Sequence, residues 1–307
     1  MQRLTDAQVD RIARELAGRL GATPPAVSAP AGASAPASTP APAPRDVPLA
    51  QLQSGDGIFE TVDECVAAAR AAFEALDGMT LAKRHEIVAA IREAMHREGD
   101  ALARLAWEET GLGRTEDKVV KNRLVTDKTP GPEILVPETT TGDDGLTLTE
   151  WAPFGVIGAI TPTTNPTSTI ICNTIGMVAA GNAVAFNVHP GAAACSRQTV
   201  QSIDRAIRSV GGPANLVTAV ATPTIESATE LMGHPDVDLL VVTGGPGVVK
   251  AAMKSGKRAI CAGPGNPPVV VDQTADLEQA GRDIVRGASF DNNVICVDEK
   301  QVFVVDG

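Results

Sequence analysis

The feature that most constrains the fold is a series of short apolar runs separated by helical stretches in the second half of the chain. The runs lie at Val156–Ile160, Ala183–Val188, Leu216–Val220, Leu239–Val242 and Val269–Val271. Runs this short are typical of buried strands, and the helical periodicity between them supplies the crossovers that parallel strands need. The sequence therefore predicts an α/β fold built on a doubly wound parallel sheet.

Helices are expected between these strands and before the first of them. The intervals hold helical patterns at Thr167–Ala180, Ala194–Ser209, Ile225–Met232 and Gly247–Lys254. Earlier in the chain, helices are predicted at Val62–Leu76, Leu81–His96 and Ala101–Glu109, and a β-ribbon at Leu146–Glu150. The first of these helices begins with a capping box formed by Thr61 and Glu64. A chain of 307 residues has room for two packed domains.

A separate amphipathic helix is predicted within residues 1–21. Thr5 and Gln8 match a capping box, and Val9 is placed to pack against Leu4 before the cap. The apolar stripe of this helix then continues through Ile12, Ala13, Leu16 and Leu20. A helix of this length is marginal alone, so its apolar stripe is expected to bind a partner surface.

The segment after this helix has the composition of a linker. From Ala22 to Pro44 it consists almost entirely of Ala, Pro, Ser and Thr, which bury too little apolar surface to order a chain. Residues 22–56 are therefore predicted to form a disordered, semi-extended linker. The helix is expected to stand apart from the packed body as a docking peptide. The alternative is a frayed terminus that happens to be amphipathic.

Composition excludes several classes of function. The chain has 26 Lys+Arg against 37 Asp+Glu, a net charge of −11, which argues against nucleic acid as a partner. No stretch has the roughly 20 apolar residues that a membrane helix needs, and no secretory signal is visible, so a cytoplasmic protein is expected. The five cysteines lack the spacing of a disulfide scaffold, and no metal-ligand spacing is present, so no metal site is predicted.

Two turns that follow strands are candidate binding elements. In the turn Thr161–Pro166, two prolines restrict the backbone that presents Asn165, whose amide is a suitable oxyanion donor. From this turn alone, a helix cap by Asn165 is an equally good interpretation. The turn Thr243–Gly247 contains glycines that let the backbone approach a phosphate, although many such turns contain a glycine pair.

One cysteine stands out from the other four. Cys65, Cys172, Cys195 and Cys261 lie in helical or strand patterns, where a buried and inert thiol is the default. Cys296 follows the polar loop Ser289–Asn293, whose amides and backbone N–H groups favour a reactive thiol. Before it, Ala262–Pro268 forms a rigid Gly/Pro turn between two strand candidates.

The order of these elements is more specific than any one of them. The Asn165 turn, the Thr243-Gly244-Gly245 turn, the Gly-Pro-Gly-Asn-Pro-Pro turn and Cys296 resemble the aldehyde dehydrogenase superfamily. Within it, the chain resembles the CoA-acylating aldehyde dehydrogenases of bacterial microcompartments, which act on acetaldehyde or propionaldehyde. The resemblance covers Gly57–Gly307 and includes Glu109–Gly113 and Thr129–Gly131.

The resemblance implies a role for each matching position. Cys296 is expected to be the nucleophile and Asn165 the oxyanion-hole amide. The positions expected to line the NAD site are Thr161, Pro162, Thr163, Thr164, His189, Pro190, Gly244, Gly245 and Gly263. His189-Pro190 stands where hydrolytic relatives carry Lys-Pro beside the adenosine ribose. Ala192 replaces the acidic residue of those relatives, so NAD is expected while NADP stays open.

One departure from the hydrolytic members concerns the acyl acceptor. Their general-base glutamate aligns with Ala262, so the thioester on Cys296 is expected to await CoA rather than water. The expected reaction is oxidation of a short-chain aldehyde to acyl-CoA with NAD. One alternative is an NAD(P)-dependent enzyme that releases free acid. The other is a catalytically dead, truncated subunit that acts as cargo or scaffold.

The resemblance also sets expectations for domains and partners. Residues 57–260 are expected to form the NAD-binding domain and residues 261–307 the first part of a catalytic domain. Because the family continues past the cysteine, the chain ending at Gly307 is expected to be a truncated form, inactive alone. The full-length enzyme is expected to be a homo-oligomer inside a cytoplasmic microcompartment, with residues 1–21 as an encapsulation-type helix that binds shell proteins.

Overall fold

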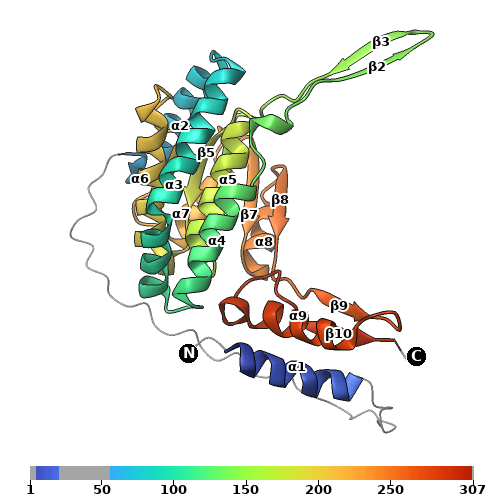
Figure 1. Ribbon diagram of the computed structural model, residues 1–307. Helices are drawn as coiled ribbons and strands as arrows, with labels where there is room; N and C mark the ends of the chain where they lie inside the picture. The colour runs from blue at the N-terminus through green and yellow to red at the C-terminus, as the bar shows by residue number, and fades with distance from the viewer. Residues whose placement is uncertain (1–4, 21–55, 306–307) are drawn as a thin grey trace. The chain divides into compact units, whose positions relative to one another are not determined.

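The computed structural model describes residues 5–20 and 56–305, which fall into two compact units (Figure 1). The larger unit spans residues 44–111 and 115–264, and the smaller spans residues 1–43, 112–114 and 265–307. The predicted linker lies outside the described residues except for Asp56, as do Leu4 and Gly307.

The larger unit is built on a six-stranded parallel sheet with the strand order β1-β6-β5-β4-β7-β8. Its strands are β1 (Ile58–Phe59), β4 (Val156–Ile160), β5 (Ala183–Asn187), β6 (Val217–Val220), β7 (Leu239–Thr243) and β8 (Ala259–Ala262). From β4 the chain moves outward through β5 to β6, then returns to the other side of β4 for β7 and β8. The predicted doubly wound α/β fold is therefore confirmed, with its switch point between β4 and β7.

Seven helices of the described chain belong to this unit, together with two short 3₁₀ helices and a hairpin. The helices are α2 (Val62–Asp77), α3 (Leu81–Thr110), α4 (Thr115–Lys128), α5 (Pro166–Ala179), α6 (Ala193–Ser209), α7 (Ile225–Gly233) and α8 (Pro246–Lys254). The 3₁₀ helices are η2 (Pro132–Ile134) and η3 (Pro190–Ala192). The hairpin strands, β2 (Glu138–Gly142) and β3 (Gly145–Thr149), are exposed throughout and overlap the predicted ribbon. The core lies between the sheet and the helices, where β4, β5 and β6 are buried along their whole length.

Two helical predictions differ from the structure. The two helices predicted across residues 81–109 are one continuous helix, α3, because its packing against α4 and α6 outweighs the local cost of Gly99. The Asn122 side-chain amide donates to the Gly99 carbonyl at 2.9 Å, so the backbone at this point is tied to the neighbouring helix. The second difference is α4 itself, which was not predicted.

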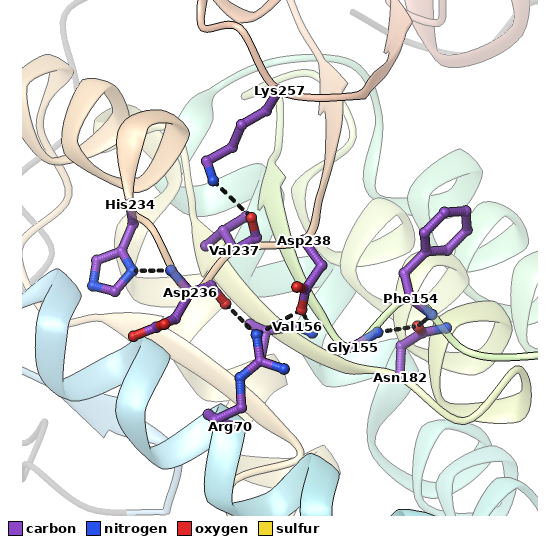
Figure 2. Close-up of polar contacts among 10 residues, drawn as sticks. All are labelled: Arg70, Phe154, Gly155, Val156, Asn182, His234, Asp236, Val237, Asp238 and Lys257. Atoms are coloured by element: carbon purple, nitrogen blue, oxygen red, sulfur yellow. Dashed lines mark hydrogen bonds and ion pairs between the residues drawn. The ribbon is translucent and has the colours of Figure 1, made fainter.

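At the end of the sheet where β4, β5 and β7 begin, side chains bind the backbone of the strands (Figure 2). One carboxylate oxygen of Asp238, just before β7, accepts the Val156 N–H at 2.8 Å and the Arg70 guanidinium at 2.6 Å. Asn182, just before β5, accepts the Phe154 N–H at 2.7 Å. These contacts fix the register of β4 against the strands on both of its sides.

The smaller unit contains two parallel strands and three helical segments among its described residues. The strands are β9 (Pro268–Val271) and β10 (Gln301–Val304), and the helical segments are α1 (Asp6–Leu20), α9 (Leu277–Ser289) and η4 (Phe290–Asn293). Within this unit α1 packs along α9, with Val9 and Ala13 buried (Figure 1). The closest approach is at Gly281, where a Cβ would lie 2.9 Å from the Ala13 carbonyl oxygen.

The N-terminal helix forms with its predicted cap and packs on α9 within the smaller unit. Thr5 and Gln8 exchange backbone-to-side-chain hydrogen bonds of 2.8 and 3.3 Å. Val9 and Ala13 of its apolar stripe are buried, whereas the separation of this helix from the larger unit stays a prediction. The surface that α1 packs against is therefore a helix of the same chain, α9. No helix in the described part of the chain is long and apolar enough to cross a membrane.

Replacement of Asp238 by Ala tests the support of the end of the sheet where β4, β5 and β7 begin. We expect the free energy of unfolding to fall by about 2 kcal/mol, because the Val156 N–H and Arg70 lose a charged acceptor. Denaturant titration measures this change. The control is Asp63→Ala, which breaks the 3.0 Å contact of an exposed carboxylate with His234 and should cost less than about 1 kcal/mol. Equal losses in the two variants would contradict this role of Asp238.

Candidate active site

The loops after β4 and β7 lie at the same edge of the sheet, on either side of the switch point. Ile160 and Val242 are register partners, so Thr161–Asn165 and Gly244-Gly245 leave the sheet from neighbouring strand ends. In open α/β sheets the crevice at such a point binds the ligand. The two turns predicted from sequence to line the cofactor are thus brought together by the topology.

The groups at this edge fit a dinucleotide. Helix α8 begins at Pro246 with Gly245 as its N-cap and no side-chain cap, and a Cβ on Gly245 would have nothing within 4 Å. Its first backbone N–H groups are therefore suited to a pyrophosphate. The hydroxyl of Thr161 is buried and has no hydrogen-bond partner among the described residues. A ligand hydroxyl or phosphate would satisfy it.

Asn165 occupies the N-cap position of α5 but makes no capping hydrogen bond. Its Oδ1 accepts from the Lys121 ammonium at 2.6 Å, and its Nδ2 donates to the Thr164 hydroxyl at 3.0 Å. Because the ammonium can only donate, it fixes which side of the amide carries the N–H₂. The cap interpretation is thus not supported by the contacts, and the role of the amide as an oxyanion donor stays a prediction.

Lys121 belongs to a buried polar face of α4 that sequence reasoning missed. The face consists of Asp117, Lys118, Lys121, Asn122 and Thr126, all buried. The Lys118 ammonium donates to the Thr164 carbonyl at 3.1 Å, and the Thr167 hydroxyl donates to Asn122 at 2.9 Å. Polar side chains of α4 thus bind the Asn165 turn and the start of α5. The pattern that could have revealed this face is a helical stretch that carries polar residues at the positions where an apolar stripe is expected.

His189 and Pro190, which are predicted to lie beside the adenosine ribose, are in the turn after β5. The Nδ1 atom of His189 accepts the Gly191 N–H at 3.0 Å, and burial lowers the pKa of His189 below its usual range. The imidazole is therefore neutral at pH 7, with its proton on Nε2, which leaves a donor for a hydroxyl such as that of ribose. A Cβ on Gly191 would lie 3.7 Å from the Thr163 hydroxyl, so this turn also lies beside the loop after β4.

Glu109 sets the start of the helix that follows this turn. Its two carboxylate oxygens accept the N–H groups of Ala194 and Cys195, each at 2.8 Å, at the N-terminus of α6. A buried carboxylate at a helix N-terminus is stabilised by the free N–H groups there. This is the physical role of Glu109 in the Glu-Thr-Gly motif, and it fixes the chain just after His189-Pro190.

Cys296 lies in the smaller unit, in a partly buried loop after η4. The Lys300 ammonium donates to the Ile295 carbonyl at 3.1 Å, and the Ile295 N–H donates to Asp298 at 3.3 Å. At Gly265, in the turn before β9, a Cβ would overlap the Cys296 carbonyl oxygen, so glycine is required there. Asn165 and Cys296 belong to different units, and their pairing stays a prediction.

The five thiols differ in their surroundings. Burial raises the pKa of Cys65 to about 12 and raises that of Cys195 well above its usual range. Cys172, Cys261 and Cys296 are partly buried. Within the described part of the chain, no group of three or more His, Cys, Asp or Glu side chains is arranged to hold a metal ion.

Comparison with known proteins identifies the family. Residues 35–307 match the model of the aldehyde dehydrogenase family. The chain belongs to this family. It is 50% identical to the acetylating acetaldehyde dehydrogenase EutE of Escherichia coli over 268 residues, which cover 84% of this chain and 57% of that protein. It is 48% identical to the CoA-propanoylating propanal dehydrogenase of Citrobacter freundii over 252 residues, covering 82% of this chain and 55% of that protein.

Solved structures agree with this assignment. The propionaldehyde dehydrogenase of Rhodopseudomonas palustris with bound propionyl-CoA superposes with a TM-score of 0.79 at 50% identity, covering 82% of this chain and 56% of that chain. A propionaldehyde dehydrogenase from the fucose utilisation microcompartment of Clostridium phytofermentans gives the same TM-score of 0.79 at 49% identity, covering 82% and 58%. The chain therefore spans about half the length of the relatives it matches, and the family resemblance inferred from the sequence is confirmed.

Alkylation by iodoacetamide tests the assignment of inert and available thiols. A pKa of about 12 leaves only about one Cys65 side chain in 10⁴ as thiolate at pH 8. We therefore expect Cys65 and Cys195 to react at least about 10²-fold more slowly than Cys296, as measured by mass spectrometry of peptides over time. The urea-unfolded chain is the control, because there the difference should disappear. Comparable rates in the folded protein would refute the assignment.

Proposed function

We propose that the protein oxidises a short-chain aldehyde, acetaldehyde or propionaldehyde, to its CoA thioester, with NAD as the hydride acceptor. The relatives at about 50% identity are acetylating or CoA-propanoylating dehydrogenases. The observation that carries the proposal is Ala262, the last residue of β8, whose exposed side chain offers no carboxylate where hydrolytic relatives have a general base. The reaction should therefore end in transfer to a thiol.

The first half of the proposed reaction makes a thioester on the protein. The Cys296 thiolate adds to the aldehyde carbonyl, and the resulting oxyanion accepts a hydrogen bond from the Asn165 Nδ2. Lys121 keeps the Asn165 Oδ1 occupied, so the amide does not rotate its carbonyl oxygen toward the oxyanion. The loops after β4 and β7 would hold NAD, which would supply the hydride acceptor for oxidation of the thiohemiacetal to the thioester.

The second half of the proposed reaction is decided by which nucleophile attacks the thioester. Water needs a positioned base to attack at neutral pH, and Ala262 cannot act as one. The thiol of CoA is the stronger nucleophile and takes the acyl group, releasing Cys296. A structure of the Rhodopseudomonas palustris relative contains CoA and an acylated cysteine, which supports the same sequence of steps here.

The preference between the two nicotinamide cofactors is proposed as NAD. The neutral His189 in the turn after β5 suits a ribose hydroxyl, which favours NAD, whereas Ala192 leaves no acidic side chain to repel the 2′-phosphate of NADP. An engineered glycolyl-CoA reductase at 49% identity contains NADP⁺, so this fold accepts the phosphorylated cofactor in at least that relative. NADP use by this protein stays open within the proposal.

The acyl acceptor can be tested with the protein expressed from its gene, including whatever follows codon 307. With propionaldehyde and NAD, we expect NADH formation to be slow without CoA and to rise sharply when CoA is added, with propionyl-CoA as product. Cys296→Ser should abolish turnover because a hydroxyl lacks thiolate character at neutral pH. Asn165→Ala should lower turnover by about 10²–10³-fold, the usual effect of removing one oxyanion donor.

The controls for this assay separate the acylating from the hydrolytic reaction. Cys172→Ala should retain turnover, because this residue lies in α5 and has no proposed role. Ala262→Glu should divert part of the product to propionate by supplying a base. Equal NADH rates with and without CoA, with propionate as the main product, would reject the acylating assignment in favour of free-acid release.

We also propose that the enzyme resides in a bacterial microcompartment and that residues 1–21 bind its shell proteins. A relative at 49% identity comes from such a compartment. The amphipathic α1, with its capped start, has the form of a helix that binds a groove on a partner, and binding the shell through Val9 would require α1 to leave α9. The homo-oligomer implied by the family resemblance stays a prediction.

The shell proposal can be tested with two matched substitutions in α1. Val9→Asp places a charge in the apolar stripe, whereas Ala7→Asp places the same charge on an exposed position of the same helix. We expect Val9→Asp and deletion of residues 1–21 to abolish co-sedimentation with purified shells, and Ala7→Asp to retain it. Retention of shell binding after the deletion would contradict the proposal.

A further inference from the structure

The turn before Cys296 has an unusual backbone. Asp291, Asn292 and Asn293 all have left-handed conformations, with φ of 45°, 57° and 61°. This region is unfavourable for residues with a Cβ, and Asn and Asp tolerate it best, usually as single residues. Three in succession persist only where the surrounding structure imposes them, and such sites cluster at functional loops.

Asp291 is the residue that ties this turn to another part of the chain. It is fully buried, and its Oδ1 accepts the Arg114 N–H at 2.7 Å. Arg114 in turn donates through its guanidinium to the Ser289 carbonyl at 2.6 Å. The Asn292 amide donates to the Gly113 carbonyl at 3.0 Å. The segment Leu112–Arg114 therefore forms a strap to which Asp291 and Asn292 of the turn are bound.

The contacts after the turn carry this constraint to the cysteine. The Asn293 amide donates to the Ala288 carbonyl at 2.7 Å, and Lys300 donates to the Asn293 side chain and to the Ile295 carbonyl. Gly265 lies against the Cys296 carbonyl with no room for a Cβ. The Cys296 peptide therefore lies between the anchored turn and the Gly265 backbone.

We propose that Asp291 is a positioning residue for Cys296: its buried carboxylate anchors the left-handed turn to the Leu112–Arg114 strap and thereby fixes where the loop presents the thiol. The inference rests on the proposed role of Cys296 as the nucleophile. A nucleophile displaced by about 1 Å costs roughly 10²-fold in rate, so an anchor of this kind affects turnover more than substrate binding.

Three variants separate the carboxylate contact from the cost of the backbone conformation. Asp291→Gly keeps the left-handed region accessible but removes the acceptor of the Arg114 N–H. Asp291→Asn tolerates the same backbone and retains an oxygen acceptor. The matched control is Asp204→Ala, because the buried Asp204 also accepts a backbone N–H, that of Asn215, at 2.7 Å, but in the larger unit.

Two measurements on these variants test the inference. In amide hydrogen exchange on the 307-residue chain, Asp291→Gly should lose protection in peptides covering residues 292–298, Asp291→Asn should retain it, and Asp204→Ala should leave these peptides unchanged. In protein expressed from its gene, Asp291→Gly should lower kcat for acyl-CoA formation about 10²-fold with little change in KM, and Asp291→Asn should restore most of the loss.

The outcomes distinguish the inference from the proposed function. If Asp291→Gly lost only thermal stability, as Asp204→Ala should, with normal kcat and normal exchange at 292–298, the positioning role would be overturned. An Asp291→Asn variant as impaired as Asp291→Gly would also overturn it, because the retained oxygen would then not act as the anchor. If the wild-type protein formed no acyl-CoA, the proposed function would fail, whereas loss of protection confined to 292–298 would still support the anchor.

Discussion

The register between β4 and β7 is the constraint on which the rest of the larger unit depends. Pairing of Ile160 with Val242 places the ends of the two strands side by side, so the loops after them share one edge of the sheet. At the opposite edge, Asp238 bonds the first residue of β4 from the residue before β7. A shift of one residue would exchange the side chains of β4 between the two buried faces of the sheet and disrupt the packing on both. The loops proposed to bind the cofactor thus depend on the same strand pairing that Asp238 supports at the far end of β4 and β7.

The sequence was sufficient for elements whose physics is local. Short apolar runs between helical stretches indicate parallel strands, and the Thr61–Glu64 capping box forms as the residue types predict. The turn residues after β4 and β7 could be found because proline restricts the backbone and glycine allows conformations that other residues avoid. Their convergence followed from the expected doubly wound topology and needed no side-chain detail.

Elements held by tertiary contacts could not be predicted from the sequence. Helix α4 has no apolar stripe, because its buried face binds carbonyl and amide groups of neighbouring elements, as Lys121 does with Asn165. Hydrophobic periodicity cannot find such a helix. The sequence also left Asn165 open between a helix cap and an oxyanion donor, since the distinction depends on a lysine 44 positions away. The sequence predicted two helices where α3 is continuous, and the bond from Asn122 that ties Gly99 to α4 cannot be read from the sequence.

The contact between Arg114 and Asp291 joins residues 177 positions apart, which has a consequence for the order of assembly. Closing a longer loop costs more chain entropy, and contacts of high sequence separation form late in folding. During synthesis the strap at Leu112–Arg114 leaves the ribosome long before the turn that it holds. The thiol of Cys296 therefore lies on an unrestrained segment until nearly the whole described chain has been made, and the loop around it is among the last parts to acquire its native form.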